Sequence, residues 1–277
     1  MVGVSNAVAF TNTVRRYILN KIPGATTAYG LTKLKNTATK CMRVRRSSDS
    51  LELDIGFVGN NLDTDTLLTF VGSSSGYISK WYDQSGHGND ASQVTAANQP
   101  RLVNAGVLED SPYFDGSNSY LLIPDVALVA GNNDLTMGVV ANVTDNSVIR
   151  TLMSHGVKTD GSLPYIAYQT NATIMNTYNA GIVLNNPVSN SFSNSFMATF
   201  RYTASNLSLE AVINNDFANK GTKIYASPQN FTPSNGAIGV RKVDNVYKHM
   251  GYIYGAFIFN RVLLDIEIEK VYEVLRR

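Results

Sequence analysis

The chain of 277 residues is long enough to bury a sizeable core, and an all-β sandwich of this length often forms one domain. Its single cysteine, Cys41, excludes an intrachain disulfide and any metal site built from several cysteines. The first residues lack the charged start and apolar run of a signal peptide, and no run of about 18 apolar residues could span a bilayer. We therefore expect a soluble protein with no membrane partner and no visible export signal.

Charge is distributed unevenly along the chain. The formal net charge is only +2, but residues 1–48 carry nine lysines and arginines and no acid, so the other 14 bases face all 21 acids. This asymmetry favours contact between the basic segment and something acidic, such as a nucleic acid, another subunit or the rest of the same chain. A basic face that folds onto the chain's own acidic domain explains it equally well.

The first predicted element is a helix over residues 6–20. Pro23 and Gly24 end it, and its apolar positions recur at helical spacing: Ala7, Phe10, Val14 and Tyr17. A helix of about 15 residues is marginal in water, so its apolar stripe must pack on the domain or on another protein. We therefore expect an N-terminal helical arm, residues 1–25, that binds a partner.

After residue 24 short apolar runs alternate with Gly, Asn, Asp and Ser, which is typical of strands separated by turns. The predicted strands are Met42–Arg46, Tyr77–Tyr82, Tyr120–Ile123, Leu135–Val143, Thr151–His155, Tyr165–Gln169, Phe196–Tyr202, Leu207–Ile213, Ala237–Val240 and Gly251–Asn260. Short helices are predicted at Asp63–Phe70 and Asp265–Leu275, and a long loop at Asn185–Ser195. Many strands with a closing helix favour an all-β sandwich or jelly roll.

Several short motifs suggest catalysis or metal binding, but their sequence context does not support it. Ser74 lies in a Gly-x-Ser-x-Gly pattern, but a helix precedes it and a strand follows, which is the wrong order for a nucleophile elbow. The three histidines are scattered without zinc-site spacing. Asp83, Asn89 and Asp90 could offer oxygens to calcium, but the full ligand pattern is missing. We expect no metal and no cofactor.

The stretch KWYDQSGHGND, Lys80–Asp90, is the most chemically varied part of the chain. One interpretation is a structural turn, since Asp83 can accept from nearby backbone N–H groups while Gly86 and Gly88 permit positive φ. The other is a ligand loop, in which one of two adjacent aromatics faces the core and the other forms a platform. The candidate ligand-binding residues are Trp81, Tyr82, Asp83, His87, Asn89 and Asp90.

Three stretches resemble known families. Residues 43–103 resemble a segment of many bacteriophage virion proteins and, more distantly, the catalytic domain of the arabinofuranosidase B family, which has a similar Tyr-Asp-Gln-Ser-Gly motif. Tyr113–Asp125 and Gly251–Leu275 resemble the Phe-Asp-Gly strand entry and the last strand and helix of concanavalin A-like, laminin-G-type jelly rolls. The resemblance implies such a jelly-roll domain at residues 26–277, with an N-terminal helical arm and a short C-terminal helix.

The arabinofuranosidase resemblance also implies where catalytic acids would lie. Asp244 falls roughly where that family places its acid/base aspartate, but residues 170–184, which correspond to the region of its nucleophile, contain no acid. No Asp or Glu occurs anywhere from Gly161 to Leu209. A retaining glycosidase needs two carboxylates, so we expect a protein that is not an enzyme, with Asp244 in a hairpin turn.

We therefore expect a non-enzymatic bacteriophage virion structural protein, either a capsid decoration or a tail-associated surface protein. Its expected partners are other virion proteins and copies of itself, with a host-surface glycan as a further candidate and no direct contact with nucleic acid. The residues expected to bind a partner through the arm are Phe10, Val14, Arg15, Arg16 and Tyr17. A glycoside hydrolase of arabinofuranosidase type and a free lectin are the alternatives.

Overall fold

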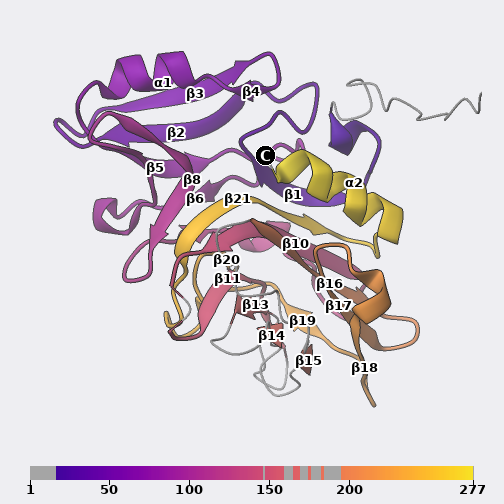
Figure 1. The fold of residues 1–277 in the computed structure, drawn as a ribbon. Coiled ribbons are helices and arrows are strands. Elements are labelled where there is room, and N and C mark those ends of the chain that lie inside the picture. Colours follow the sequence, from indigo (N-terminus) through magenta and orange to yellow (C-terminus); the bar gives the residue numbers. More distant parts are fainter. Residues whose placement is uncertain are drawn as a thin grey trace, which may run out of the picture.

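The computed structural model describes residues 17–145, 147–158, 165–168, 174–175, 182–183 and 195–276. In these ranges the chain is mostly β, and most of its strands join one antiparallel sheet that folds into layers, with two α-helices at its surface (Figure 1). The expected all-β jelly-roll sandwich is confirmed. No helix in the described part is long and apolar enough to cross a membrane.

The jelly-roll half is organised around β21, Met250–Phe259, which pairs with three other strands. Its partners are β1 (Ala25–Gly30), β8 (Val107–Asp115) and β10 (Leu135–Val143). The sheet continues from β10 through β16 (Phe196–Thr203) and β17 (Ser208–Ile213) to β18 (Gly221–Ile224). All nine residues of β10 are buried, so both faces of this strand lie in the interior.

A second group of strands carries the N-terminal half, and Figure 1 shows it on the opposite side of β21 from β16 and β17. It contains β2 (Lys40–Arg46), β3 (Glu52–Val58), β5 (Gly76–Trp81) and β7 (Arg101–Asn104). One α-helix, α1 (Thr64–Val71), begins at the Asp63 cap and buries Leu67 and Val71 in the same core cluster as Val44 and Ile55. Because neighbours in a strand point to opposite faces, Arg43 and Arg45 lie on the other face of β2, where they are half-buried.

Shorter strands complete the main sheet and form two small two-stranded sheets, β12 with β19 and β14 with β15. They are β4 (Asn61–Leu62), β6 (Ala91–Ser92), β9 (Leu121–Leu122), β11 (Arg150–Ser154), β12 (Val157–Lys158), β13 (Tyr165–Tyr168), β14 (Ile174–Met175), β15 (Ile182–Val183), β19 (Phe231–Thr232) and β20 (Ala237–Ile238). Short 3-10 turns lie at Ile18–Asn20, Ala96–Asn98, Asp125–Ala127 and Phe217–Asn219. All predicted strands that fall in the described ranges are present, with ends that shift by a few residues.

The N-terminal arm differs from the expectation where the structure describes it. Tyr17 has a left-handed φ of 55°, and only a 3-10 turn follows, so the predicted helix does not continue to Asn20. Ile18 and Leu19 of this turn are buried in one cluster with the C-terminal helix α2, Asp265–Leu275. The last part of the expected arm therefore packs on the domain. Residues 1–16, and all but Ser195 of the predicted loop at 185–195, lie outside the described residues.

Candidate functional site

The 83–90 loop is fastened to β1 by hydrogen bonds. Asp83 accepts from the backbone N–H of Ala28 at 2.9 Å, Ser85 at 2.8 Å and Asn89 at 3.1 Å, and from the Ser85 hydroxyl at 2.6 Å. The backbone N–H of Gln84 donates to the Ala28 carbonyl at 2.8 Å. The loop thus occupies the edge of β1 that β21 leaves open.

Other side chains of the loop point into the protein. Gln84 is 1% exposed, and its amide donates to the Gly30 carbonyl and accepts from the Leu34 N–H. The Asn89 side chain donates to the Thr26 carbonyl at 2.8 Å. The side chains of Asp83, Gln84 and Asn89 are thus hydrogen-bonded within the protein. The structural-turn interpretation of this loop therefore agrees with the geometry.

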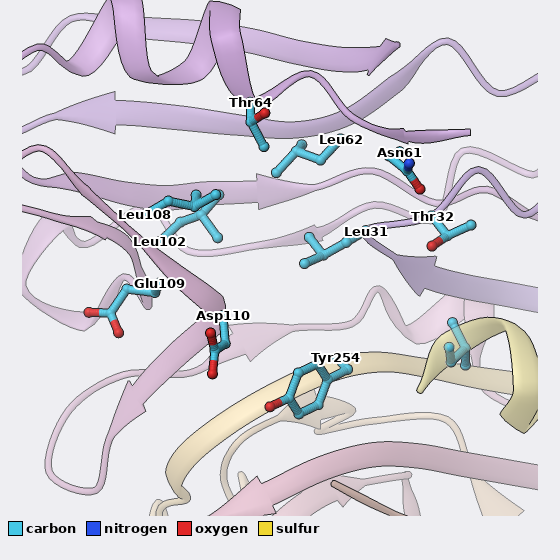
Figure 2. A pocket seen from close by; sticks show the side chains of 11 residues that line it. Leu31, Thr32, Asn61, Leu62, Thr64, Leu102, Leu108, Glu109, Asp110 and Tyr254 are labelled. Carbon is cyan, nitrogen blue, oxygen red and sulfur yellow. The ribbon is translucent and has the colours of Figure 1, made fainter. Parts of the chain in front are cut away.

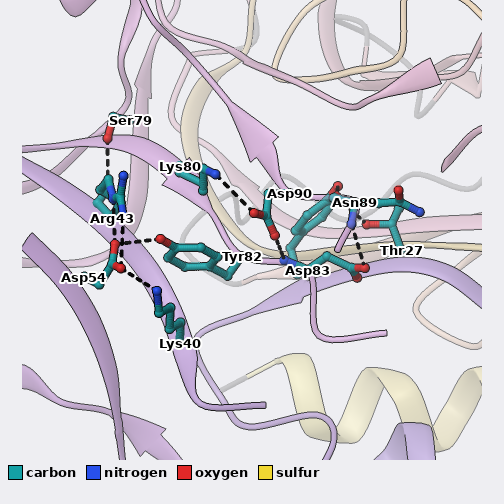
Figure 3. A network of polar contacts seen from close by, with 11 residues as sticks. Thr27, Lys40, Arg43, Asp54, Ser79, Lys80, Tyr82, Asp83, Asn89 and Asp90 are labelled. Carbon is teal, nitrogen blue, oxygen red and sulfur yellow. Dashed lines mark hydrogen bonds and ion pairs between the residues drawn. The ribbon is translucent and has the colours of Figure 1, made fainter. Parts of the chain in front are cut away.

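The two aromatics before the loop divide as expected, one inward and one outward. Trp81 is fully buried, 5.9 Å from the Tyr29 ring, so it cannot serve as a binding platform. This corrects its place among the candidate ligand residues. Tyr82 is half-buried, and Figure 3 shows its hydroxyl directed at Asp54, to which it donates at 2.6 Å.

Asp54 forms ion pairs with two basic residues of the N-terminal segment. Arg43 donates to it at 2.6 Å and Lys40 at 2.7 Å (Figure 3). The Arg43 hydrogen bond holds the pKa of Asp54 well below its usual range, while burial and the Asp54 contact raise the pKa of Tyr82. Arg46 pairs in the same way with Asp49. Three of the nine bases in residues 1–48, Lys40, Arg43 and Arg46, are thus paired with acids of their own domain.

The remaining candidates of the loop do not form a metal site. Asp90 pairs with Lys80 at 3.2 Å and accepts from the Asp83 N–H. His87 is exposed, and its Nδ1 lies 3.0 Å from the Ser85 hydroxyl. Among the described residues no group of three His, Cys, Asp or Glu side chains is placed to hold a metal ion.

A row of arginines and tyrosines crosses the outward face of the N-terminal strands. Arg45 of β2 pairs in register with Tyr77 of β5, which pairs with Arg101 of β7. Arg101 in turn pairs with Tyr113 of β8, and Tyr113 with Tyr252 of β21. Residues paired across an antiparallel sheet share a face and contact one another, so this row is one continuous surface.

The side chains of this row lie against one another. The guanidinium carbon of Arg45 is 5.2 Å from the centre of the Tyr77 ring, and that of Arg101 is 5.1 Å from the Tyr113 ring. The rings of Tyr113 and Tyr252 are 5.3 Å apart and tilted by 57°. Cation–π and aromatic contacts of this kind fix the orientation of side chains that are half-exposed.

A groove of about 410 Å³ lies along this row. We call it the tyrosine–arginine groove, and it is lined by Arg45, Tyr77, Ala96, Ala97, Gln99, Arg101, Tyr113, Asp115 and Ser119. Its polar groups are held in place: the Arg45 Nε donates to the Gln99 amide oxygen at 2.7 Å, and Gln99 donates onward to the Gln93 carbonyl at 2.9 Å. The groove therefore combines half-exposed tyrosine rings with oriented donors.

Glu109 fixes the β7–β8 side of the row. Its carboxylate is 9% exposed, lies 2.6 Å from the Arg101 guanidinium and accepts from the Tyr252 hydroxyl at 2.9 Å. Burial and the neighbouring Glu109 raise the pKa of Tyr252 to about 12. Tyr252 is thus a neutral donor at physiological pH, and the charge of Arg101 is compensated.

A second hollow, of about 220 Å³, lies between β4, β8, β21 and α2. Figure 2 shows leucine side chains around it, with Glu109, Asp110 and Tyr254 along one side. Its leucines are Leu31, Leu62, Leu102, Leu108 and Leu275, and we call it the leucine hollow. It offers fewer oriented polar groups than the tyrosine–arginine groove.

The other predicted site residues are not gathered at either hollow. Phe10, Val14, Arg15 and Arg16 lie outside the described residues. Tyr17 is described, and the Lys33 ammonium lies 5.9 Å from its ring centre, within the chain itself.

Asp244 lies in a turn closed by a bridge between Arg241 and Val246, as predicted. Its carboxylate forms an ion pair with Arg241, whose Nε donates at 3.0 Å.

The sequence did not point to the groove. Arg45 and Tyr77 belong to predicted strands, but the strands that supply Arg101 and Tyr113 were missed. The one available signal was alternation in β2, where Arg43 and Arg45 flank the buried Val44.

The fold and groove define a jelly-roll sandwich with an open aromatic and polar groove on one sheet face. No protein-family model matches the chain, and no curated protein matches it. Solved structures do resemble it. A GH54 α-L-arabinofuranosidase soaked with a cyclic sulfate inhibitor has a TM-score of 0.66, 14% identity and coverage of 93% of this chain and 64% of that one.

A second arabinofuranosidase structure, complexed with arabinofuranosyl-α-1,2-xylobiose, has a TM-score of 0.61 and 14% identity. The match again covers 93% of this chain and 64% of that one. A Trypanosoma rangeli sialidase in complex with sialic acid has a TM-score of 0.51 and 14% identity, and the match covers 70% of this chain and 31% of that one. This chain therefore spans less than two thirds of the arabinofuranosidase chains. The similarity confirms the arabinofuranosidase-like fold and nothing finer.

Proposed function

We propose that this protein binds carbohydrate through the tyrosine–arginine groove and does not hydrolyse it. The observation that carries the proposal is the register that places Tyr77 and Tyr113 beside arginines on one open sheet face. A half-exposed tyrosine offers an apolar ring face next to a polar hydroxyl, which suits the C–H face and hydroxyls of a sugar. The structural neighbours are named an arabinofuranosidase and a sialidase in complex with sialic acid, and carbohydrate binding is consistent with those names.

A glycan array tests the proposal. The wild type should bind a subset of glycans, and Tyr77→Ala and Tyr113→Ala should each weaken binding by about tenfold or more, since the ring supplies the contact surface. Tyr254→Ala, which changes the leucine hollow instead, is the control and should leave binding unchanged. Binding that is lost only in the control would move the site to that hollow.

The absence of catalysis is part of the proposal. Asp244 is paired with Arg241, and the sequence has no acid from Gly161 to Leu209 to serve as a second carboxylate. We expect no release of nitrophenol from a 4-nitrophenyl arabinofuranoside. Hydrolysis that Asp244→Asn abolishes would establish an arabinofuranosidase in place of a binding protein.

Display on a bacteriophage particle stays a prediction from the sequence resemblance, because the arabinofuranosidase and sialidase structures do not bear on it. A virion protein with this groove would present it outward, with other virion proteins or copies of itself beneath. Mass spectrometry of purified particles should then detect the chain at a fixed copy number. Its absence from particles, with glycan binding retained, would favour the free lectin.

A further inference from the structure

The arginines of this chain differ in how their charge is compensated. The arginines that form ion pairs with carboxylates are Arg43, Arg46, Arg101, Arg150, Arg201, Arg241 and Arg261. Among the arginines that the structure describes, only Arg45 and Arg276 have no such partner. Arg276 lies next to the C-terminus and is exposed, whereas Arg45 lines the tyrosine–arginine groove.

The contacts of Arg45 leave its charge uncompensated but fix its direction. Its Nε donates to the neutral Gln99 amide, and its guanidinium carbon is 5.2 Å from the Tyr77 ring centre. Gln99 is 5% exposed and is itself anchored, so the guanidinium is held from two sides. Its two terminal nitrogens have no acceptor among the described residues. They form a planar fork of donors, which matches a carboxylate.

Neither of the other charged residues that line the groove, Arg101 and Asp115, forms an ion pair with Arg45. The charge of Arg101 is compensated by its ion pair with Glu109. One carboxylate oxygen of Asp115 accepts hydrogen bonds within its own turn, from the backbone N–H groups of Ser117, Asn118 and Ser119 at 2.9, 2.7 and 3.0 Å. The groove therefore contains an oriented positive group without an ion-pair partner beside two tyrosine rings, while the second oxygen of the Asp115 carboxylate has no hydrogen-bond partner among the described residues.

We propose that the groove selects a saccharide that bears a carboxylate, with Arg45 as the group that binds the carboxylate and Tyr77 and Tyr113 as the surface for the sugar ring. This rests on the proposed carbohydrate binding and names the class of ligand. A uronic acid or another acidic sugar fulfils both requirements, whereas a neutral sugar leaves the Arg45 fork to water.

The test compares each acidic glycan with its own methyl ester. Oligogalacturonides and sialylated oligosaccharides are titrated calorimetrically into the full chain beside their esters, which keep the sugar and remove the charge. The wild type should prefer the acids by about tenfold. Arg45→Gln should remove that preference without weakening the ester, and Arg45→Lys should restore part of it. Arg276→Gln, which changes the other described arginine that has no ion pair, should leave binding unchanged.

Each other outcome has a distinct meaning, and the melting temperature of every variant checks that it folds. Equal binding of acid and ester at the groove would overturn the carboxylate inference and leave carbohydrate binding intact. Failure of every glycan, acidic and neutral, would overturn both. If polyglutamate binds as tightly as the best acidic glycan, the groove binds acidic peptide and is not selective for saccharide.

Discussion

Replacing Asp83 by alanine removes one acceptor that serves four donors. Two of these donors, the backbone N–H groups of Ala28 and Asn89, belong to buried residues. A buried donor that loses its partner costs about 1–3 kcal/mol, and hydrogen bonds to a charged group contribute about 1.5–3 kcal/mol each. We therefore expect Asp83→Ala to lower the free energy of unfolding by about 3 kcal/mol.

Urea denaturation followed by tryptophan emission measures this change, with Asp110→Ala as the matched control. Asp110 is an exposed aspartate for which no hydrogen bond or ion pair is found among the described residues, so its loss should change stability by no more than about 0.5 kcal/mol. If Asp83→Ala is as stable as this control but loses glycan binding, the 83–90 loop is a ligand loop and the structural interpretation is wrong.

Three further predictions concern the core, the pH dependence and the N-terminus. Trp81, fully buried, should emit at short wavelength and resist quenching, and Trp81→Ala should cost about 3–5 kcal/mol; a red emission would contradict its burial. Burial lowers the pKa of His155 to about 4 and that of His249 to about 3. The stability that each neutral histidine contributes is therefore fully present above the unfolded pKa near 6.5 and decreases as the pH falls, by about 2–3 kcal/mol per histidine at pH 4.5. His249→Phe should flatten the dependence of the free energy of unfolding on pH. If residues 1–16 serve attachment, their deletion should preserve the melting temperature, whereas deletion of 1–25 removes a buried turn and should lower it.

Much of the fold followed from sequence periodicity. The buried strand at Leu135–Val143 and the closing helix at Asp265–Leu275 have the bounds that their apolar patterns predict. β1 was missed because five of its six residues are buried, so it has no alternation of polar and apolar residues to mark it. β3 does alternate, with apolar residues at 53, 55 and 57, and that signal could have identified it.

The candidate site depended on information that a single sequence does not contain. The 83–90 loop was identifiable as a turn because its aspartate and glycines act locally. The tyrosine–arginine groove instead depends on the register between strands far apart in the chain, such as the pairing of Tyr113 with Tyr252. The left-handed conformation of Tyr17, which lies within the stretch predicted to be helical, also had no sequence signal.

We propose that the tyrosine–arginine groove, and not the 83–90 loop, receives the ligand. Amide chemical shifts recorded while the best-binding glycan is titrated into the protein test this most directly. The structure predicts changes at Tyr77, Arg101 and Tyr113, with Gly86 and Gly88 unaffected. Changes confined to the 83–90 loop, or to the leucine hollow around Leu31, would contradict the account.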